Sequence, residues 1–218
     1  MTENNLTNSD LPQDNLVYLL DGKIYINLTN KCTNACIFCI RSLKDDVCGK
    51  NLWLATENSS TKDVLEQLKP LVKDNSEVIF CGYGEPTLKL DVLKEVAKFV
   101  KDNYQNVKIR LNTNGHANFV YKRDITHELV GLIDEISVSL NASSEALYKE
   151  LSQPNLDCNN TLEEVKDFIK KSVEAGIPTV ASVVNGYKDF KIDIEKCEKI
   201  SKDLGAEFRV REWLDNGY

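Results

Sequence analysis

Short apolar strands alternate with longer amphipathic segments along most of this chain, and this order constrains the fold more than any other feature. Helix patterns cover about 61–74, 90–104, 125–134, 161–176 and 193–204, and strand patterns cover 23–29, 77–81, 107–112, 136–141, 178–184 and 207–213. Strands joined through a helix of this length are expected to pair in parallel, because the helix returns the chain to the end of the sheet where the previous strand began. The sequence therefore predicts an α/β fold with six parallel strands.

Three local signals refine this order. Asp21-Gly22 links two apolar-rich runs, 16–20 and 23–29, and such a two-residue link predicts a β-hairpin at the N-terminal end. Thr161-Leu-Glu-Glu164 has the capping-box pattern and is expected to start the fourth helix. Pro70 argues against the last turn of the first helix.

Several predicted strands alternate strictly between apolar and polar side chains. In one of them, Ile109 and Leu111 alternate with Arg110 and Asn112. The same pattern recurs in the strands at 23–29, 136–141 and 207–213. Central parallel strands are normally apolar on both faces, so a polar row indicates a lumen that holds water or a ligand. The pattern predicts an open or partial barrel around a ligand; the alternative is an antiparallel sheet with one wet face.

Three of the seven cysteines share one short loop: Cys32, Cys36 and Cys39. Three thiolates at this spacing can hold an iron–sulfur cluster, but a cubane has four irons, so one iron would lack a protein ligand. One alternative is a structural zinc site with Cys48 or a histidine as fourth ligand. Another is a ferredoxin-like electron carrier, for which no fourth cysteine is evident.

The spacing Cys32-x3-Cys36-x2-Cys39, with Phe38 before the third cysteine, resembles the signature of the radical S-adenosylmethionine (SAM) superfamily. The order of elements over about 23–213 resembles the core of that family, a partial (β/α)6 TIM-like barrel, here with an N-terminal β-hairpin. Three further motifs resemble the short TatD-associated radical SAM proteins, namely Cys81-Gly-Tyr-Gly-Glu-Pro-Thr87, Leu111-Asn-Thr-Asn-Gly-His116 and Ser137-Val-Ser-Leu-Asn-Ala142.

The resemblance implies a specific chemistry. In the family, three cysteines hold one [4Fe–4S] cluster, and the open iron binds the amino and carboxylate groups of SAM. One electron from the cluster cleaves SAM to methionine and a 5′-deoxyadenosyl radical, which abstracts hydrogen from a substrate. The resemblance therefore implies an anaerobic enzyme with a cluster and SAM as cofactors, and with flavodoxin or ferredoxin as reductant. The competing interpretation is a non-catalytic module that uses the loop as a zinc or iron–sulfur anchor.

By the same resemblance, the ends of the strands should bind SAM. The residues expected there are Gly82, Tyr83, Gly84, Glu85, Asn112, Thr113, Asn114, Ser139, Asn141 and Arg211. The Glu85 carboxylate would pair with the SAM ammonium, and Arg211 would bind the SAM carboxylate or an anionic substrate. The alternatives are ordinary polar turns for the former and an internal ion pair for the arginine. His116, beside the same turn, is a weaker candidate for proton transfer.

Composition limits the remaining possibilities. The formal net charge of −7 argues against a nucleic-acid binder that uses a broad basic surface. No stretch is apolar enough for a membrane span, and the start of the chain does not resemble a signal peptide, so a cytoplasmic protein is expected. Residues 1–15 are predicted to be a disordered tail, and 16–218 a single domain. The substrate is expected to be a small molecule or an exposed segment of a partner protein.

Overall fold

The computed structural model describes residues 14–47 and 49–213, so most of the predicted tail lies outside it. A seven-stranded sheet forms its centre, in the order β1-β2-β5-β6-β7-β8-β9. The strands are β1 (Val17–Leu20), β2 (Lys23–Ile26), β5 (Glu77–Phe80), β6 (Lys108–Thr113), β7 (Glu135–Ser139), β8 (Thr179–Asn185) and β9 (Glu207–Glu212). β1 and β2 are antiparallel, and every other neighbouring pair is parallel. The prediction of six parallel strands is confirmed.

The N-terminal hairpin forms as its turn residues require. Asp21 and Gly22 have φ values of 50° and 75°. Positive φ at both turn positions gives the twist that joins two antiparallel strands tightly. Leu20 is paired directly with Lys23, which places β2 at the start of the parallel sheet.

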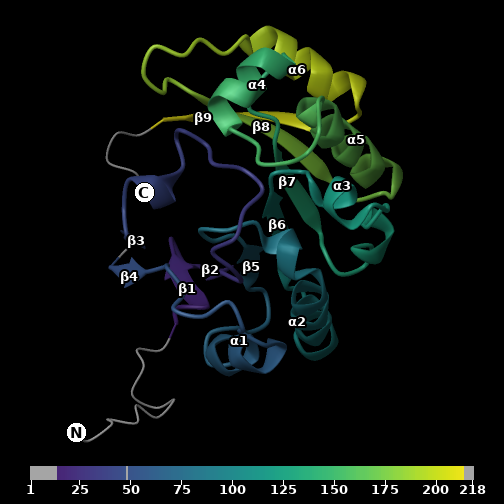
Figure 1. The fold of residues 1–218 in the computed structure, drawn as a ribbon. Helices are drawn as coiled ribbons and strands as arrows, with labels where there is room; N and C mark the ends of the chain where they lie inside the picture. Colours follow the sequence, from purple (N-terminus) through teal and green to yellow (C-terminus); the bar gives the residue numbers. More distant parts are fainter. Residues whose placement is uncertain (1–13, 48, 214–218) are drawn as a thin grey trace, which may run out of the picture.

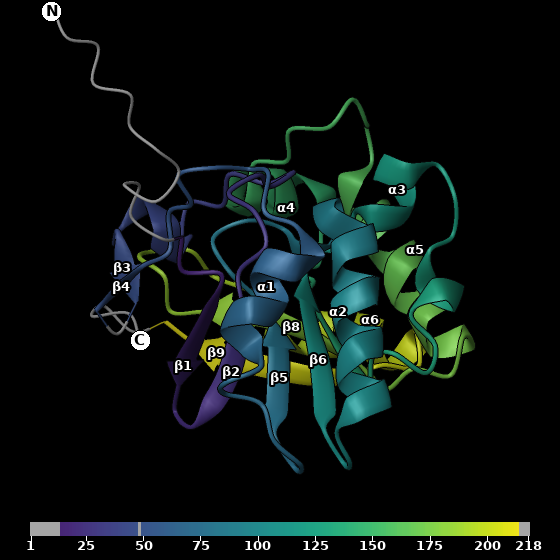
Figure 2. The same ribbon diagram turned by 90° about the horizontal axis from the view of Figure 1, so that it is seen from below.

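Helices cover one face of the curved sheet (Figures 1 and 2). They are α1 (Thr61–Leu68), α2 (Leu90–Asn103), α3 (Ala117–Tyr121), α4 (Glu145–Ser152), α5 (Thr161–Glu174) and α6 (Ile194–Asp203). The apolar rows of the strands, such as Ile109 and Leu111, pack under these helices in one continuous apolar core. The sheet ends at β1 and β9, which are not paired with each other in the described part, so the barrel is partial.

The polar rows face a cavity, as the alternation predicts. Asn112, Ser137, Ser139 and Arg211 all line it. Within the same lumen, the opposite end of the rows carries a chain of ion pairs, in which Arg110 lies 3.8 Å from Glu77. The partial-barrel interpretation is therefore confirmed, and the one-faced antiparallel sheet is wrong.

The helix predicted at 125–134 is wrong. Only a 3₁₀ turn, Thr126–Glu128, forms there, and Gly131 takes a left-handed φ of 76°. The Asp124 side chain accepts a hydrogen bond from the Thr126 N–H at 2.9 Å, which competes with a continuous helix.

The capping box predicted at Thr161 is also wrong. Asn160 is the N-cap residue, and its side chain makes no capping bond. Instead, both oxygens of Glu145 on α4 accept hydrogen bonds from the Thr161 and Leu162 N–H groups, at 2.9 and 2.8 Å. A carboxylate from a neighbouring helix thus satisfies this helix start.

Other boundaries differ in ways that local sequence explains only in part. α1 ends at Leu68, two residues before Pro70, and not at 74. α3, α4 and the small hairpin β3 (Asp46–Val47) and β4 (Lys50–Asn51) were not predicted. Within the predicted tail, Asp14 is described, and its side chain accepts a hydrogen bond from the Ala55 N–H at 2.6 Å.

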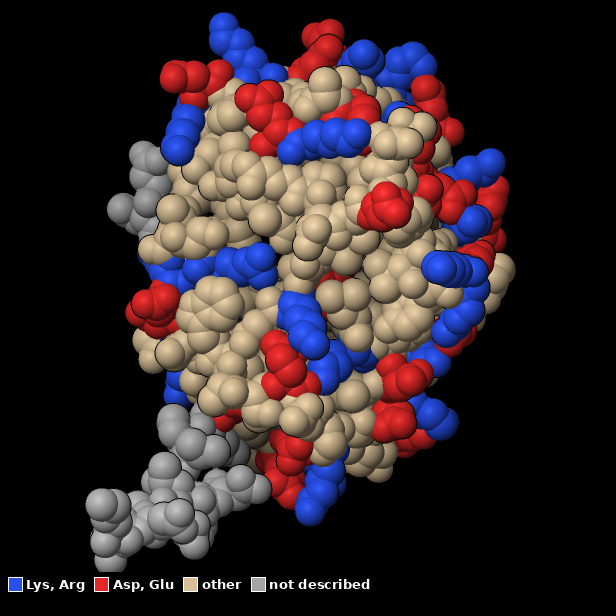
Figure 3. All heavy atoms as spheres, viewed as in Figure 1, with Lys and Arg blue, Asp and Glu red and all other residues tan. Residues whose placement is uncertain are grey.

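Figure 3 shows the charged side chains on one face of the molecule. Lysine and arginine side chains are interspersed with aspartate and glutamate around the rim. Throughout residues 14–47 and 49–213, no helix has the length and apolar character needed to span a membrane.

Candidate cofactor-binding site

A cavity of about 470 Å³ opens at the carboxyl ends of the parallel strands. In parallel βα folds this end is where ligands bind. Three segments contribute most of its wall: the cysteine loop after β2, the turn after β5, and the polar rows of β6 to β9. Nine of the ten residues predicted to bind SAM line it: Gly82, Gly84, Glu85, Asn112, Thr113, Asn114, Ser139, Asn141 and Arg211.

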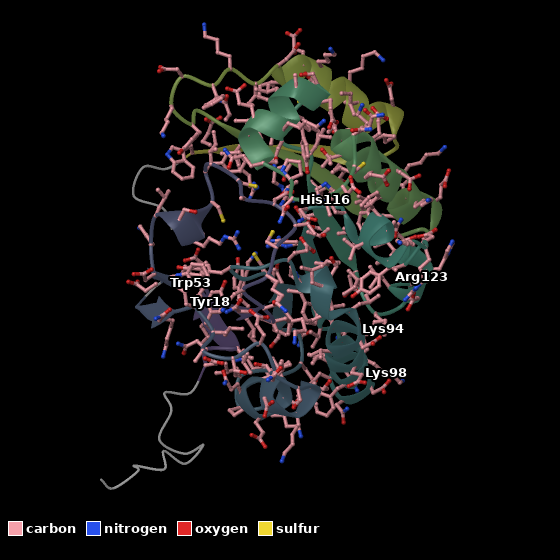
Figure 4. The ribbon with its side chains drawn as sticks, in the orientation of Figure 1. Tyr18, Trp53, Lys94, Lys98, His116 and Arg123 are labelled. Atoms are coloured by element: carbon pink, nitrogen blue, oxygen red, sulfur yellow. The ribbon has the colours of Figure 1, made fainter. Side chains whose placement is uncertain are left out.

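Tyr83 is the exception. Its hydroxyl donates to the Lys44 carbonyl at 2.6 Å, and its ring packs edge-on against Trp53 with centroids 5.3 Å apart. Its side chain lies in a small apolar cluster with Tyr18, away from the cavity; Figure 4 places Tyr18 and Trp53 on the same side of the molecule. The Tyr83 side chain is therefore buried away from the cavity, and the assignment of Tyr83 to SAM binding stays a prediction that concerns its backbone.

The cysteine loop is fixed to the end of α4 by backbone hydrogen bonds. The Ala35 N–H donates to the Ser152 carbonyl at 3.1 Å, and the Ile37 N–H donates to the Leu151 carbonyl at 3.0 Å. The last carbonyls of a helix lack partners within it, so a loop that supplies donors stabilises both segments. A helix that was not predicted thus supports the predicted cysteine loop.

A buried polar network also supports the cysteine loop. The Asn114 amide donates to the Thr33 hydroxyl at 2.7 Å, and this hydroxyl lies 3.1 Å from His116 Nδ1. The Tyr148 hydroxyl lies 3.1 Å from His116 Nε2 and accepts a hydrogen bond from the Asn34 amide at 3.3 Å. Both ring nitrogens of the histidine are therefore occupied within the protein.

His116 does not have the position that a proton-transfer residue needs. It is 1% exposed, does not line the cavity and lies near the middle of the molecule (Figure 4). Burial lowers its pKa to about 4, so the imidazole is neutral near pH 7. The structure supports a role in holding the cysteine loop, and the proton-transfer interpretation is not supported.

Arg41 joins the cysteine loop to the turn after β5. Its guanidinium donates to the carbonyls of Asn30 at 3.0 Å, Asn34 at 3.2 Å and Tyr83 at 3.3 Å. A planar guanidinium can hold several carbonyls in a fixed arrangement. Arg41 lies two residues after Cys39 in the sequence, which did not indicate these contacts.

The glycines of the turn after β5 allow a close approach of two backbones. A Cβ on Gly84 would lie 2.2 Å from the Thr29 carbonyl oxygen and 2.5 Å from that of Lys31. A Cβ on Gly82 would lie 2.0 Å from the Asn27 side-chain oxygen. These glycines thus let the turn pack against the chain that leads into the cysteines.

The Glu85 carboxylate is buried and largely occupied by the protein. It is 4% exposed, and Oε1 accepts hydrogen bonds from the hydroxyls of Thr113 and Thr87, both at 2.7 Å. Oε2 accepts from the Asn114 N–H at 2.8 Å, while the Glu85 N–H donates to the Lys31 carbonyl at 2.8 Å. Burial raises the pKa of this carboxyl, and the hydrogen bonds oppose that shift. Glu85 therefore organises the turns after β5 and β6, a role that the sequence did not indicate.

The three predicted metal ligands are partly buried thiols. Cys36 and Cys39 line the cavity, and Cys32 Sγ lies 3.4 Å from the Asn34 N–H nitrogen and 3.6 Å from the Asn114 amide nitrogen. Burial and then the Glu85 charge raise the pKa of Cys32 to about 11, whereas burial and then Cys39 raise that of Cys36 to about 12.

These thiols fit a metal cluster as ligands. The raised pKa values of Cys32 and Cys36 mean that these two thiols keep their protons until a positive charge offsets the thiolates, and metal binding supplies that charge. The N–H groups that point at Cys32 Sγ are suited to a sulfur that carries negative charge.

The structure does not test the zinc alternative. Within 14–47 and 49–213, no group of three or more cysteine, histidine, aspartate or glutamate side chains is placed to hold a metal ion, which applies to zinc and to a cluster alike. Cys48, the proposed fourth ligand, lies outside the described residues.

The comparison with known proteins agrees with this arrangement. The radical SAM superfamily matches residues 26–199. A probable GTP 3',8-cyclase of Saccharolobus solfataricus is 27% identical over 183 residues, which is 83% of this chain and 53% of the relative. The FeMo cofactor biosynthesis protein NifB of Methanocaldococcus infernus is 26% identical over 196 residues, covering 78% of this chain and 64% of the relative. The chain thus spans less than two thirds of these relatives.

The solved structure of native anSMEcpe with bound AdoMet has a similar fold. It covers 88% of this chain and 51% of its own, with a TM-score of 0.59 and 14% identity. The superfamily match runs from the end of β2 into α6 and so includes the cysteine loop and most of the strands that line the cavity. The chain belongs to the radical SAM superfamily.

Proposed function

We propose that this chain holds one [4Fe–4S] cluster through Cys32, Cys36 and Cys39, and that it cleaves SAM in the cavity beside them. Members of its superfamily are enzymes that bind SAM and iron–sulfur clusters. When bound, the two cofactors supply a 5′-deoxyadenosyl radical, which abstracts hydrogen from a substrate. The narrower assignment to the TatD-associated group rests on the sequence motifs alone.

One observation carries the proposal: two of the three thiols line the same cavity as buried polar atoms that have no partner. The side-chain oxygens of Asn34, Asn112 and Asn141 are buried without a hydrogen bond. All three residues line the cavity with Cys36 and Cys39. Unpaired buried acceptors are costly in a folded protein, so they indicate that a ligand with donor groups completes this site.

The residues of the chain would divide the work of binding SAM. The backbone of Gly82 and Gly84 lies against the cavity without side chains, so a ligand can approach it closely. Asn114, whose amide also contacts Cys32, would orient the polar end of SAM near the cysteines. Ser139 and Asn141, on the opposite wall, offer hydrogen-bonding groups for the ribose.

The remaining expectations belong to the same proposal. A reductant such as flavodoxin or ferredoxin would supply the electron. The substrate would be a small molecule or an exposed segment of a protein. We expect neither nucleic acid nor a membrane as partner, and we expect the protein to work in the cytoplasm.

Electron paramagnetic resonance tests whether the cluster has an open iron. The protein is reconstituted with iron and sulfide without oxygen, and it is reduced with dithionite. Addition of SAM should change the spectrum of the reduced cluster, because the amino and carboxylate groups of SAM occupy the open iron. A cluster spectrum that saturating SAM leaves unchanged would favour a non-catalytic iron–sulfur module instead.

A further inference from the structure

Arg211 differs from the other arginines of the lumen because it lacks a carboxylate partner. Arg110 lies 3.8 Å from Glu77 and 4.0 Å from Glu135, and Arg209 lies 3.8 Å from Glu135. Among residues 14–47 and 49–213, no carboxylate pairs with Arg211, and its buried Nε has no hydrogen-bond acceptor. Arg211 is partly buried, and Arg110 also has a buried Nε without an acceptor, so the missing carboxylate is what distinguishes Arg211. A partly buried arginine without such a partner is suited to bind an anion.

The nearest carboxylate in sequence is already used elsewhere. The side chain of Glu212 accepts hydrogen bonds from the Asn185 amide at 3.1 and 3.2 Å. Glu212 and the buried Glu85 line the same cavity as Arg211. Among the described residues, however, neither carboxylate forms an ion pair with the Arg211 guanidinium, which is therefore available to an anion.

The wall around Arg211 can bind the rest of a polar molecule. Asn112 Oδ1 is buried without a donor, and it lines the same cavity as Arg211. Ser137 and Ser182 add neutral hydroxyl groups to this wall. Such a wall suits a molecule with hydroxyl or amino groups that also carries a carboxylate or phosphate.

Arg211 and the cysteines belong to different segments of the cavity wall. The cysteine loop follows β2, the glycine turn follows β5 and Asn114 follows β6, whereas Arg211 belongs to β9. The proposed function assigns the amino and carboxylate groups of SAM to the cluster at the cysteines. An anion bound at Arg211 would then come from a second molecule.

We propose that Arg211 binds an anionic group of the substrate, a carboxylate or a phosphate, and that Asn112 accepts a hydrogen bond from the same molecule. This inference rests on the proposed function, because it assigns the cysteine side of the cavity to SAM. It identifies the substrate class as a small polar anion.

The test uses the reconstituted holoprotein and two probes, inorganic phosphate and succinate. Phosphate binding is followed by the ³¹P line width during titration, and succinate is tested by its ability to displace phosphate. Arg211→Gln removes the guanidinium, and Arg209→Gln is the matched control on the same strand and face, since Arg209 has a carboxylate partner. Arg211→Lys keeps the positive charge but removes the planar guanidinium that can donate two hydrogen bonds to one anion. Iron content and thermal melting show that each variant is folded.

We expect the phosphate affinity of Arg211→Gln to be at least tenfold lower than that of the wild type, and the affinity of Arg211→Lys to be intermediate. The phosphate affinity of Arg209→Gln should stay within twofold of the wild type. SAM affinity should stay within twofold in all three. If succinate displaces phosphate, the site also accepts carboxylates. If phosphate binds and succinate does not displace it, the anion is restricted to phosphate, and this result equally supports the site.

Three results would overturn the inference. One is absence of phosphate and succinate binding to the wild type, and another is equal weakening in the Arg209 and Arg211 variants. The third is a loss of SAM affinity in Arg211→Gln with phosphate binding unchanged, which would assign Arg211 to the SAM carboxylate. Failure of the wild type to bind SAM would refute the proposed function, and the phosphate titration would still report on Arg211 separately.

Discussion

The neutral, buried His116 should make the stability of the fold depend on pH in a defined window. Its folded-state pKa is about 4, against an ordinary value of 6.5. Between these values the unfolded chain binds a proton that the folded protein does not, so stability falls as the pH falls. From pH 7.5 to pH 5, this linkage amounts to about 2 kcal/mol of unfolding free energy. Below about pH 4 the contribution of this residue levels off.

Urea denaturation of the metal-free protein at pH 7.5 and pH 5 measures the effect. Carboxylates also titrate on the way down, so the comparison requires variants. His116→Gln should lose the His116 part of the pH dependence, although its stability at pH 7.5 will be lower because two buried hydrogen bonds change. His127→Gln is the matched control, because His127 is the other histidine of the chain and its side chain is 72% exposed.

We expect wild type and His127→Gln to lose about 2 kcal/mol more than His116→Gln over this pH range. Equal losses in all three proteins would show that His116 titrates normally. The buried network behind the cysteine loop would then be wrong as described.

Three further predictions concern the loop, the turn and the ligands. Gly84→Ala should lower the unfolding free energy by about 3 kcal/mol, because backbone atoms obstruct the added Cβ. Its control Gly131→Ala should lower it by about 1 kcal/mol, because there only the positive φ is unfavourable. Equal urea midpoints for the two variants would refute this. Glu85→Gln should lower the unfolding free energy by about 2 kcal/mol, because its carboxylate accepts several buried hydrogen bonds; unchanged stability with weaker SAM binding would assign it to the ligand alone. Cys36→Ala should remove the visible cluster absorption and Cys158→Ala should not; loss in both would make the ligand assignment wrong.

The parts of the fold that were predictable depend on repeated local patterns. The six parallel strands followed from the alternation of strand and helix patterns along the chain. The polar lumen followed from the alternation of apolar and polar residues within strands, and the first turn followed from Asp21-Gly22. Each of these signals lies within a few consecutive residues. The same holds for the cysteine loop, whose spacing alone identified the three candidate ligands.

The parts that were not predictable depend on contacts between distant segments. Glu145 caps a helix that begins sixteen residues later, so a capping box in the local sequence was misleading. The Tyr83 side chain packs away from the cavity because of its contacts with Trp53 and Lys44, and Arg41 binds the carbonyls of three separate residues. Such contacts become visible only when the chain is folded.

The most direct test of the proposed chemistry is the release of 5′-deoxyadenosine. Wild-type protein is reconstituted without oxygen, analysed for iron and sulfide, and then incubated with SAM and dithionite. We expect about four irons and four sulfides per chain and a 5′-deoxyadenosine product that Cys36→Ala fails to form. One zinc per chain with intact SAM would contradict the assignment of this site.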